Sequence, residues 1–210
     1  MLIQTLAATM MALALTALPV RAEPLRIVAL GDSLTAGYGL ESPDAFTGAL
    51  EAALVARGHD VVIVNAGVSG DTASDGLARV DWSVGDDADA VIVELGANDA
   101  LRGVDPAITR DALDRLLARL AERGLPVLLA GMMAPPNLGD EYAAAFNPIY
   151  PELAEKHGAI LYPFFLDGVA ADLGLNQPDG IHPNAAGVAI IVERIAPSVE
   201  ALIAAAGGPI

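Results

Sequence analysis

Short apolar runs alternate along the chain with segments whose apolar residues recur at helical spacing. Five of these runs are apolar throughout instead of alternating with polar residues, which is typical of strands that are covered on both faces. Strands that alternate with helical patterns predict βαβ units and a parallel sheet. The predicted strands are residues 25–30, 60–65, 90–95, 126–131 and 159–162, and the predicted helices between them are residues 43–57, 72–80, 105–123 and 141–157.

The chain shows one uninterrupted pattern, without an internal repeat or a linker. Asp105 and Pro106 mark the start of one helix, and Asn184 is expected to cap a last helix that Pro197 kinks or breaks. We therefore predict a single domain over residues 23–210, folded as a three-layer α/β/α sandwich.

The first 22 residues differ from the rest. They form an apolar stretch that ends with Val20 and Ala22, small residues in the positions that a secretory cleavage site before Glu23 requires. We expect a signal peptide over residues 1–22 and a periplasmic or secreted protein without stable membrane association after cleavage. An uncleaved membrane anchor is the alternative, because no Lys or Arg precedes the apolar run and its length approaches that of a spanning helix.

Composition excludes several classes of function. Eleven Lys and Arg against 27 Asp and Glu give a net charge of −16, which argues against a nucleic-acid partner. The absence of Cys excludes disulfides and thiolate metal sites, and three His make a His-rich metal site improbable. Asp86, Asp87 and Asp89 are interpreted as a solvated loop and not as a calcium site. We expect neither a metal nor a cofactor, and a monomer that acts on small molecules.

Polar residues follow the predicted strands at the carboxyl edge, where ligands bind in sheets of this class. Ser33 comes directly after the first strand and needs a base to act as a nucleophile. His182 is the candidate base, and Asp179, three residues earlier, is placed to orient its ring. Asp32 is the rival carboxylate, but adjacent residues at a strand end point apart, so we expect it to hold the turn.

Acyl transfer also needs donors for an oxyanion. The backbone N–H groups of Ser33 and Gly67 and the side-chain amide of Asn98 follow three different strands and are expected to face one point. Apolar residues on the same turns could belong either to the core or to an acyl-binding pocket. These candidate substrate-binding residues are Leu34, Tyr38, Val68, Met132, Met133 and Leu138.

Four ordered blocks resemble the GDSL (SGNH) hydrolase superfamily: Gly31-Asp32-Ser33-Leu34, Gly67 within NAGVSGDT, Gly96-Ala97-Asn98-Asp99 and Asp179-Gly180-Ile181-His182. The flanking residues are similar to the bacterial thioesterase I, lysophospholipase and arylesterase group. The resemblance implies a cofactor-free secreted esterase with a five-stranded flavodoxin-like sheet, and assigns Ser33, His182 and Asp179 as nucleophile, base and orienting acid. It also implies oxyanion donors at Ser33, Gly67 and Asn98.

The substrate remains open at this point. Acyl esters, including aryl esters and lysophospholipids, and acyl thioesters fit the resemblance. A carbohydrate O-deacetylase of the same superfamily is one alternative, although aromatic residues make up only 4% of the chain. A non-catalytic acyl- or lipid-binding protein is the other.

Overall fold

The computed structural model describes residues 23–208, and the predicted leader lies outside them. A sheet of five parallel strands runs through the centre in the order β2-β1-β3-β4-β5. This is the flavodoxin-like order, and it reverses direction between β1 and β3, where a crevice forms at the carboxyl edge. The strands are β1 (Leu25–Gly31), β2 (Val61–Gly67), β3 (Ala90–Glu94), β4 (Val127–Ala130) and β5 (Ile160–Tyr162).

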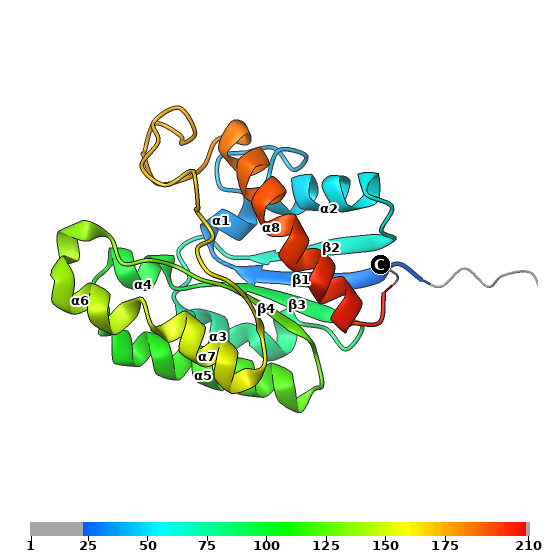
Figure 1. The fold of residues 1–210 in the computed structure, drawn as a ribbon, viewed down its shortest axis with the longest axis horizontal. Helices are drawn as coiled ribbons and strands as arrows, with labels where there is room; N and C mark the ends of the chain where they lie inside the picture. Colours follow the sequence, from blue (N-terminus) through cyan, green and yellow to red (C-terminus); the bar gives the residue numbers. More distant parts are fainter. Residues whose placement is uncertain (1–22, 209–210) are drawn as a thin grey trace, which may run out of the picture.

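Helices cover both faces of this sheet (Figure 1). On one face lie α1 (Ser33–Ala36), α2 (Phe46–Ala56) and α8 (Ala185–Ala205), and α2 packs along α8. The other face carries α3 (Ala73–Ser83), α4 (Ala97–Leu101), α5 (Pro106–Glu122), α6 (Gly139–Phe146) and α7 (Ile149–His157), with the short 3₁₀ helix η1 (Pro136–Leu138) before α6. The predicted three-layer α/β/α sandwich with a parallel sheet is confirmed.

The central strands are apolar because both of their faces are buried. Every residue of β3 is buried, and Ile27, Leu30, Ile92 and Leu128 are fully enclosed. None of the helices within residues 23–208 combines the length and the hydrophobicity that a membrane-spanning segment requires.

Two predictions about helices were wrong in detail. The segment 141–157 forms two helices, α6 and α7, which separate at Asn147 and Pro148. Pro148 has no N–H to continue the helix, and the Asn147 side chain accepts a hydrogen bond from the Ala134 N–H at 2.9 Å. Pro197, by contrast, does not break α8, which is continuous through it. This proline is exposed, as is Glu193 four residues earlier, so water can satisfy the carbonyl that lacks a helical partner.

Candidate active site

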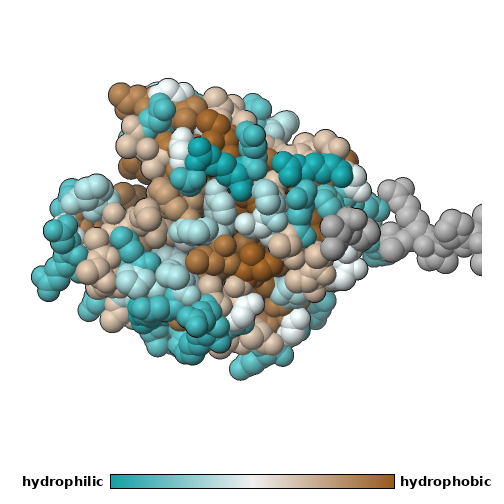
Figure 2. Space-filling model, in the orientation of Figure 1, coloured by the Kyte–Doolittle hydropathy of each residue, from teal (hydrophilic) through white to brown (hydrophobic). Residues whose placement is uncertain are grey.

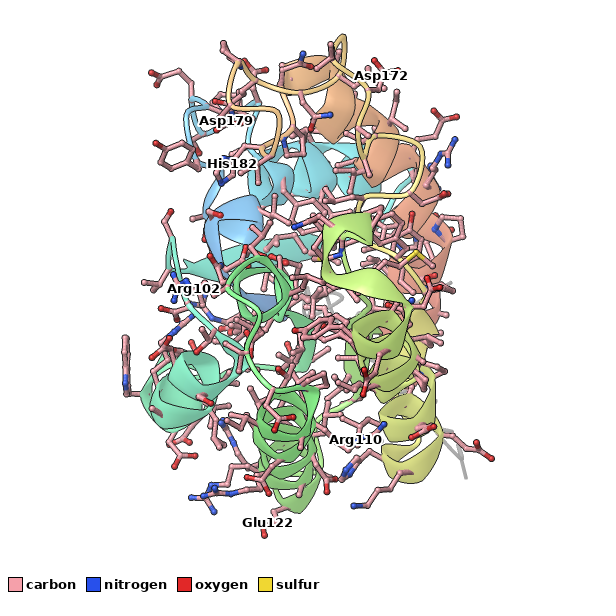
Figure 3. All side chains as sticks on the ribbon, turned by 90° about the vertical axis from the view of Figure 1, so that its left-hand side faces the viewer. Arg102, Arg110, Glu122, Asp172, Asp179 and His182 are labelled. Carbon is pink, nitrogen blue, oxygen red and sulfur yellow. The ribbon has the colours of Figure 1, made fainter. Side chains whose placement is uncertain are left out.

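The carboxyl edge of the sheet brings together residues that are far apart in the sequence. Ser33 begins α1 directly after β1, whereas Asp179 and His182 lie on the long segment between β5 and α8. Figure 3 views the molecule from this edge, with His182 and Asp179 pointing toward the α1 turn. Figure 2 shows the same edge in profile at the left, where the surface is notched between two lobes.

Ser33, His182 and Asp179 form a hydrogen-bonded chain. The Ser33 Oγ lies 2.9 Å from the His182 Nε2, and the His182 Nδ1 lies 2.7 Å from the Asp179 Oδ2. The backbone N–H groups of His182 and Ile181 donate to the other Asp179 oxygen at 3.0 and 2.9 Å. These bonds, first that of the imidazole, lower the pKa of Asp179 to about 2, so the carboxylate stays ionised beside the ring.

Tyr38 packs against the imidazole, and Gln177 holds the backbone that carries it. The Tyr38 ring lies against the imidazole ring, with 4.5 Å between the ring centroids. The Gln177 Nε2 donates to the carbonyls of Tyr38 at 2.7 Å and Pro183 at 3.0 Å, and the Gln177 N–H donates to the His182 carbonyl at 2.7 Å. Gln177 thereby ties the histidine segment to the turn that follows α1.

Beneath Ser33, a buried glutamate holds the turn that carries this residue. One Glu94 oxygen accepts hydrogen bonds from the Thr35 hydroxyl at 2.7 Å, the Thr35 N–H at 3.2 Å and the Asp32 N–H at 3.4 Å. Asp32 caps α1 by accepting from the Leu34 N–H at 2.9 Å, in agreement with the structural role expected for it. Burial raises the pKa of Asp32 to about 6, and burial together with the Asp32 charge raises the pKa of Glu94 well above its ordinary range.

These raised pKa values predict that Glu94 weakens the fold as the pH rises. Above pH 4.5, the ordinary value for glutamate, Glu94 ionises in the unfolded chain but keeps its proton in the folded protein. The contribution of protonated Glu94 to the stability of the fold is therefore complete below pH 4.5. It is lost as the pH rises through the pKa of Glu94 in the folded protein. Glu94→Gln removes this titration, so its melting temperature should rise relative to that of the wild type as the pH increases from 4 to 8.

Thermal melts of both proteins across this range test the prediction, with the exposed Glu193→Gln as the control. A difference between wild type and Glu94→Gln that is the same at every pH would contradict it.

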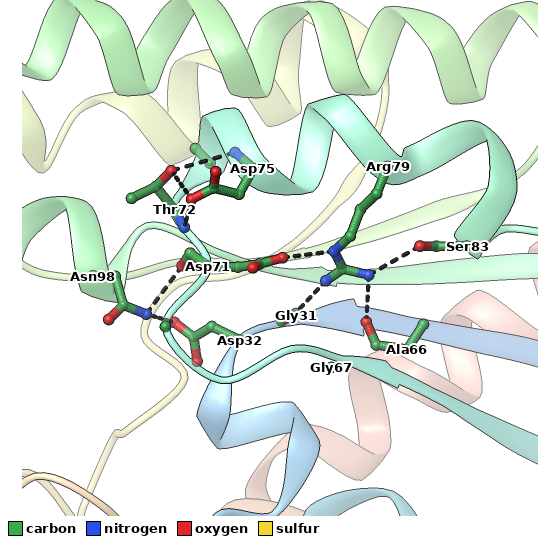
Figure 4. A network of polar contacts seen from close by, with 12 residues as sticks. Gly31, Asp32, Ala66, Gly67, Asp71, Thr72, Asp75, Arg79, Ser83 and Asn98 are labelled. Atoms are coloured by element: carbon green, nitrogen blue, oxygen red, sulfur yellow. Dashed lines mark hydrogen bonds and ion pairs between the residues drawn. The ribbon is translucent and has the colours of Figure 1, made fainter.

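A buried arginine joins the first two strand ends (Figure 4). The Arg79 guanidinium donates to the carbonyls of Gly31 and Ala66, both at 2.8 Å, and pairs with Asp71 at 2.6 Å. Gly31 precedes the Asp32–Ser33 turn and Ala66 precedes Gly67, so Arg79 fixes the spacing between the two turns. Nothing in the sequence analysis indicated Arg79 or Glu94, although a charge in the otherwise apolar run 90–95 was a usable signal for Glu94.

The three predicted oxyanion donors lie on neighbouring turns. An added Cβ on Gly67 would collide with the backbone of Ala36, so glycine allows this strand end to pass directly against α1. Two of the donors have internal partners: the Gly67 N–H donates to the Asn65 Oδ1 at 2.9 Å, and the Asn98 Nδ2 donates to Asp32 at 2.9 Å and the Asp71 carbonyl at 3.0 Å. The Ser33 N–H is the first of α1, where a helix offers no acceptor.

A small apolar pocket opens beside Ser33 and His182. Two of the six predicted substrate-binding residues line it, and the other four do not. Leu34 and Tyr38 line the pocket, together with Phe46, Phe165 and Ile191, which the sequence analysis did not single out. Val68, Met133 and Leu138 lie outside this lining with Val68 and Met133 exposed, and Met132 is buried in the core.

A serine, an imidazole and a carboxylate linked in this order at the carboxyl edge of a doubly wound sheet are the arrangement of a serine hydrolase. The chain belongs to the GDSL-like lipase/acylhydrolase family, whose family model matches residues 29–190. It is a carboxylic ester hydrolase.

Curated relatives and solved structures agree with this class. The chain is 37% identical over 192 residues to Esterase TesA of Pseudomonas aeruginosa, covering 91% of this chain and 96% of the relative. It is 35% identical over 178 residues to thioesterase 1/protease 1/lysophospholipase L1 of Escherichia coli, covering 84% of each. The crystal structure of AlinE4, an SGNH-hydrolase family esterase, superimposes with a TM-score of 0.73 at 46% identity, covering 86% of this chain and 97% of that one.

Proposed function

We propose that this protein is a secreted serine esterase that hydrolyses acyl esters, among them aryl esters and lysophospholipids, and acyl thioesters, through an acyl-enzyme on Ser33. The single observation that supports this most is the 2.9 Å contact between the Ser33 Oγ and the His182 Nε2, with Asp179 behind the ring. The names of the relatives in Pseudomonas aeruginosa and Escherichia coli support acyl esters, acyl thioesters and lysophospholipids, and a relative named arylesterase in Vibrio mimicus supports aryl esters.

In the first half of the reaction, the Ser33 Oγ attacks the acyl carbonyl carbon and its proton passes to the His182 Nε2. The carbonyl oxygen becomes an oxyanion that accepts from the Ser33 N–H, and from the Gly67 N–H and the Asn98 amide as these exchange an internal acceptor for it. His182 then gives the proton to the leaving oxygen or sulfur, and the bond between it and the acyl carbon breaks. Asp179, which is ionised beside the Nδ1–H, stabilises the imidazolium in between.

In the second half, water replaces the leaving group. His182 takes a proton from this water, whose oxygen attacks the acyl carbon of the ester on Ser33. Collapse of the second tetrahedral intermediate returns the proton to the Ser33 Oγ and releases the carboxylic acid. Each half therefore uses the same three donors and the same base.

A panel of p-nitrophenyl esters from C2 to C16, with a lysophospholipid, an acyl thioester and acetylated xylan beside it, tests the proposal. Hydrolysis together with covalent labelling of Ser33 by a fluorophosphonate is the expected result. Hydrolysis confined to acetylated carbohydrate would favour a deacetylase, and binding of acyl compounds without turnover or labelling would favour a binding protein.

The role of Asn98 has its own test. Asn98→Ala should lower kcat by about 10²–10³, because a donor to the oxyanion acts mainly in the transition state, and should change KM much less. Steady-state kinetics on p-nitrophenyl butyrate separate the two constants. A change in KM alone would refute the assignment.

We also propose that residues 1–22 are a cleaved leader and that residues 23–210 act as one domain in the periplasm or outside the cell. The small residues before Glu23 support this position of cleavage. The intact mass of the protein recovered from the periplasmic fraction of an expressing bacterium tests it. A protein that keeps its first 22 residues and sediments with membranes would instead be anchored.

A further inference from the structure

One cation at the catalytic edge forms no ion pair with a carboxylate of residues 23–208. Ten Lys and Arg residues lie within residues 23–208, and nine of them form an ion pair with a carboxylate within 4.0 Å. The exception among these ten is Arg102, which is exposed. In a protein with 27 acidic and 11 basic residues, an arginine without a carboxylate is unexpected.

Arg102 lies beside the predicted oxyanion donors. It follows α4 directly, four residues after Asn98, so the two side chains leave the helix on the same side with about 6 Å between their Cβ atoms. The Arg102 Nη2 donates to the Gly70 carbonyl at 2.8 Å, whereas Asn98 donates to the carbonyl of Asp71, the next residue. Figure 3 shows Arg102 on the same face of the molecule as His182 and Asp179.

The neighbouring carboxylates are occupied by other partners. Asp71 pairs with the buried Arg79 at 2.6 Å. Asp75 accepts hydrogen bonds from the Thr72 hydroxyl at 2.7 Å and from the Thr72 N–H at 3.0 Å, and these bonds lower the pKa of Asp75 more than the charge of Arg102 does. The guanidinium therefore keeps donors that no carboxylate of residues 23–208 occupies, on the face of the molecule that carries His182 and Asp179.

We propose that Arg102 binds an anionic group of the substrate, at a position several bonds away from the carbonyl that reacts. A guanidinium offers two parallel N–H donors that match a phosphate or a carboxylate. The anion can be a phosphate ester in the leaving group or a carboxylate at the far end of the acyl group. This inference rests on the proposed function, because it assigns a substrate class to the same site.

Two matched pairs of substrates separate the two sources. 1-Decanoylglycerol 3-phosphate and 1-decanoylglycerol differ only by a phosphate in the leaving group. The mono-p-nitrophenyl ester of adipic acid and p-nitrophenyl hexanoate differ only by a carboxylate in the acyl group. For each pair, the quantity to measure is the ratio of kcat/KM for the anionic substrate to that for the neutral one, at low ionic strength.

Arg102→Gln should lower this ratio about tenfold for at least one pair, because a hydrogen bond to a charged group is lost at a solvent-exposed site. The pair affected identifies the source of the anion. Using a ratio cancels any general effect of losing the bond to Gly70. Arg115→Gln, which removes an exposed charge from α5, is the matched control and should leave both ratios unchanged.

Two further measurements do not depend on how well Arg102→Gln folds. Arg102→Lys should give an intermediate ratio, and the wild-type ratio should fall as salt rises. Equal ratios for wild type, Arg102→Gln and Arg115→Gln would overturn the inference while leaving the esterase intact. If the wild type hydrolyses neither neutral ester, the proposed function itself fails.

Discussion

Replacing Ser33 with alanine is expected to lower kcat on p-nitrophenyl butyrate by at least ~10³-fold, because a nucleophile, its base and the orienting acid act as one unit. Without the Oγ, no acyl-enzyme forms, and only the oxyanion donors and binding remain to help water attack. The fold should tolerate the change, since the backbone of the turn is held by Asp32 and Glu94 and not by the serine hydroxyl.

The measurement is kcat for Ser33→Ala beside its melting temperature. Ser42→Ala, at an exposed serine before α2, is the matched control and should retain wild-type turnover. Labelling by a fluorophosphonate should persist in the control and disappear in Ser33→Ala. Near-normal turnover by a well-folded Ser33→Ala protein would contradict the assignment of the nucleophile.

The architecture could be predicted because its signals are local. Strands covered on both faces are continuously apolar, and their carboxyl ends meet at one edge of a parallel sheet. That topology brings Ser33 and His182 together although they lie 149 positions apart in the sequence. The polar turns after the strands thus indicated the site before any distance was known.

Residues that support the site were missed because their partners are backbone groups. Arg79 donates to the carbonyls of Gly31 and Ala66. Because every residue has a backbone carbonyl, the sequence does not show which of them accepts a hydrogen bond from a side chain. In a helical pattern, an arginine reads as a solvent-exposed residue. Phe46, Phe165 and Ile191 were missed for a different reason: residues that line an apolar pocket are of the same type as those that fill the core.

Arg79→Met is expected to lower the free energy of unfolding by about 3–5 kcal/mol, the usual cost of breaking a buried ion pair from one side. Arg79 and Asp71 have side-chain exposures of only 8% and 13%, so the Asp71 carboxylate would remain poorly solvated and without its cation. The carbonyls of Gly31 and Ala66 would also lose a charged donor. Since these carbonyls precede the Ser33 and Gly67 turns, kcat should fall as well.

Urea denaturation of Arg79→Met, Arg79→Lys and the surface control Arg110→Met separates the contribution of the charge from that of the planar guanidinium. Lysine keeps the charge but lacks the planar guanidinium that reaches both carbonyls and Asp71. The decrease in the free energy of unfolding should therefore be smaller for Arg79→Lys than for Arg79→Met and larger than for the control. Arg110 pairs with Glu152 on the surface, where such a pair is worth at most about 1 kcal/mol. If Arg79→Met unfolds at the same urea concentration as Arg110→Met, the buried arginine does not hold the two strand ends together, and the spacing of the Ser33 and Gly67 turns must come from the sheet alone.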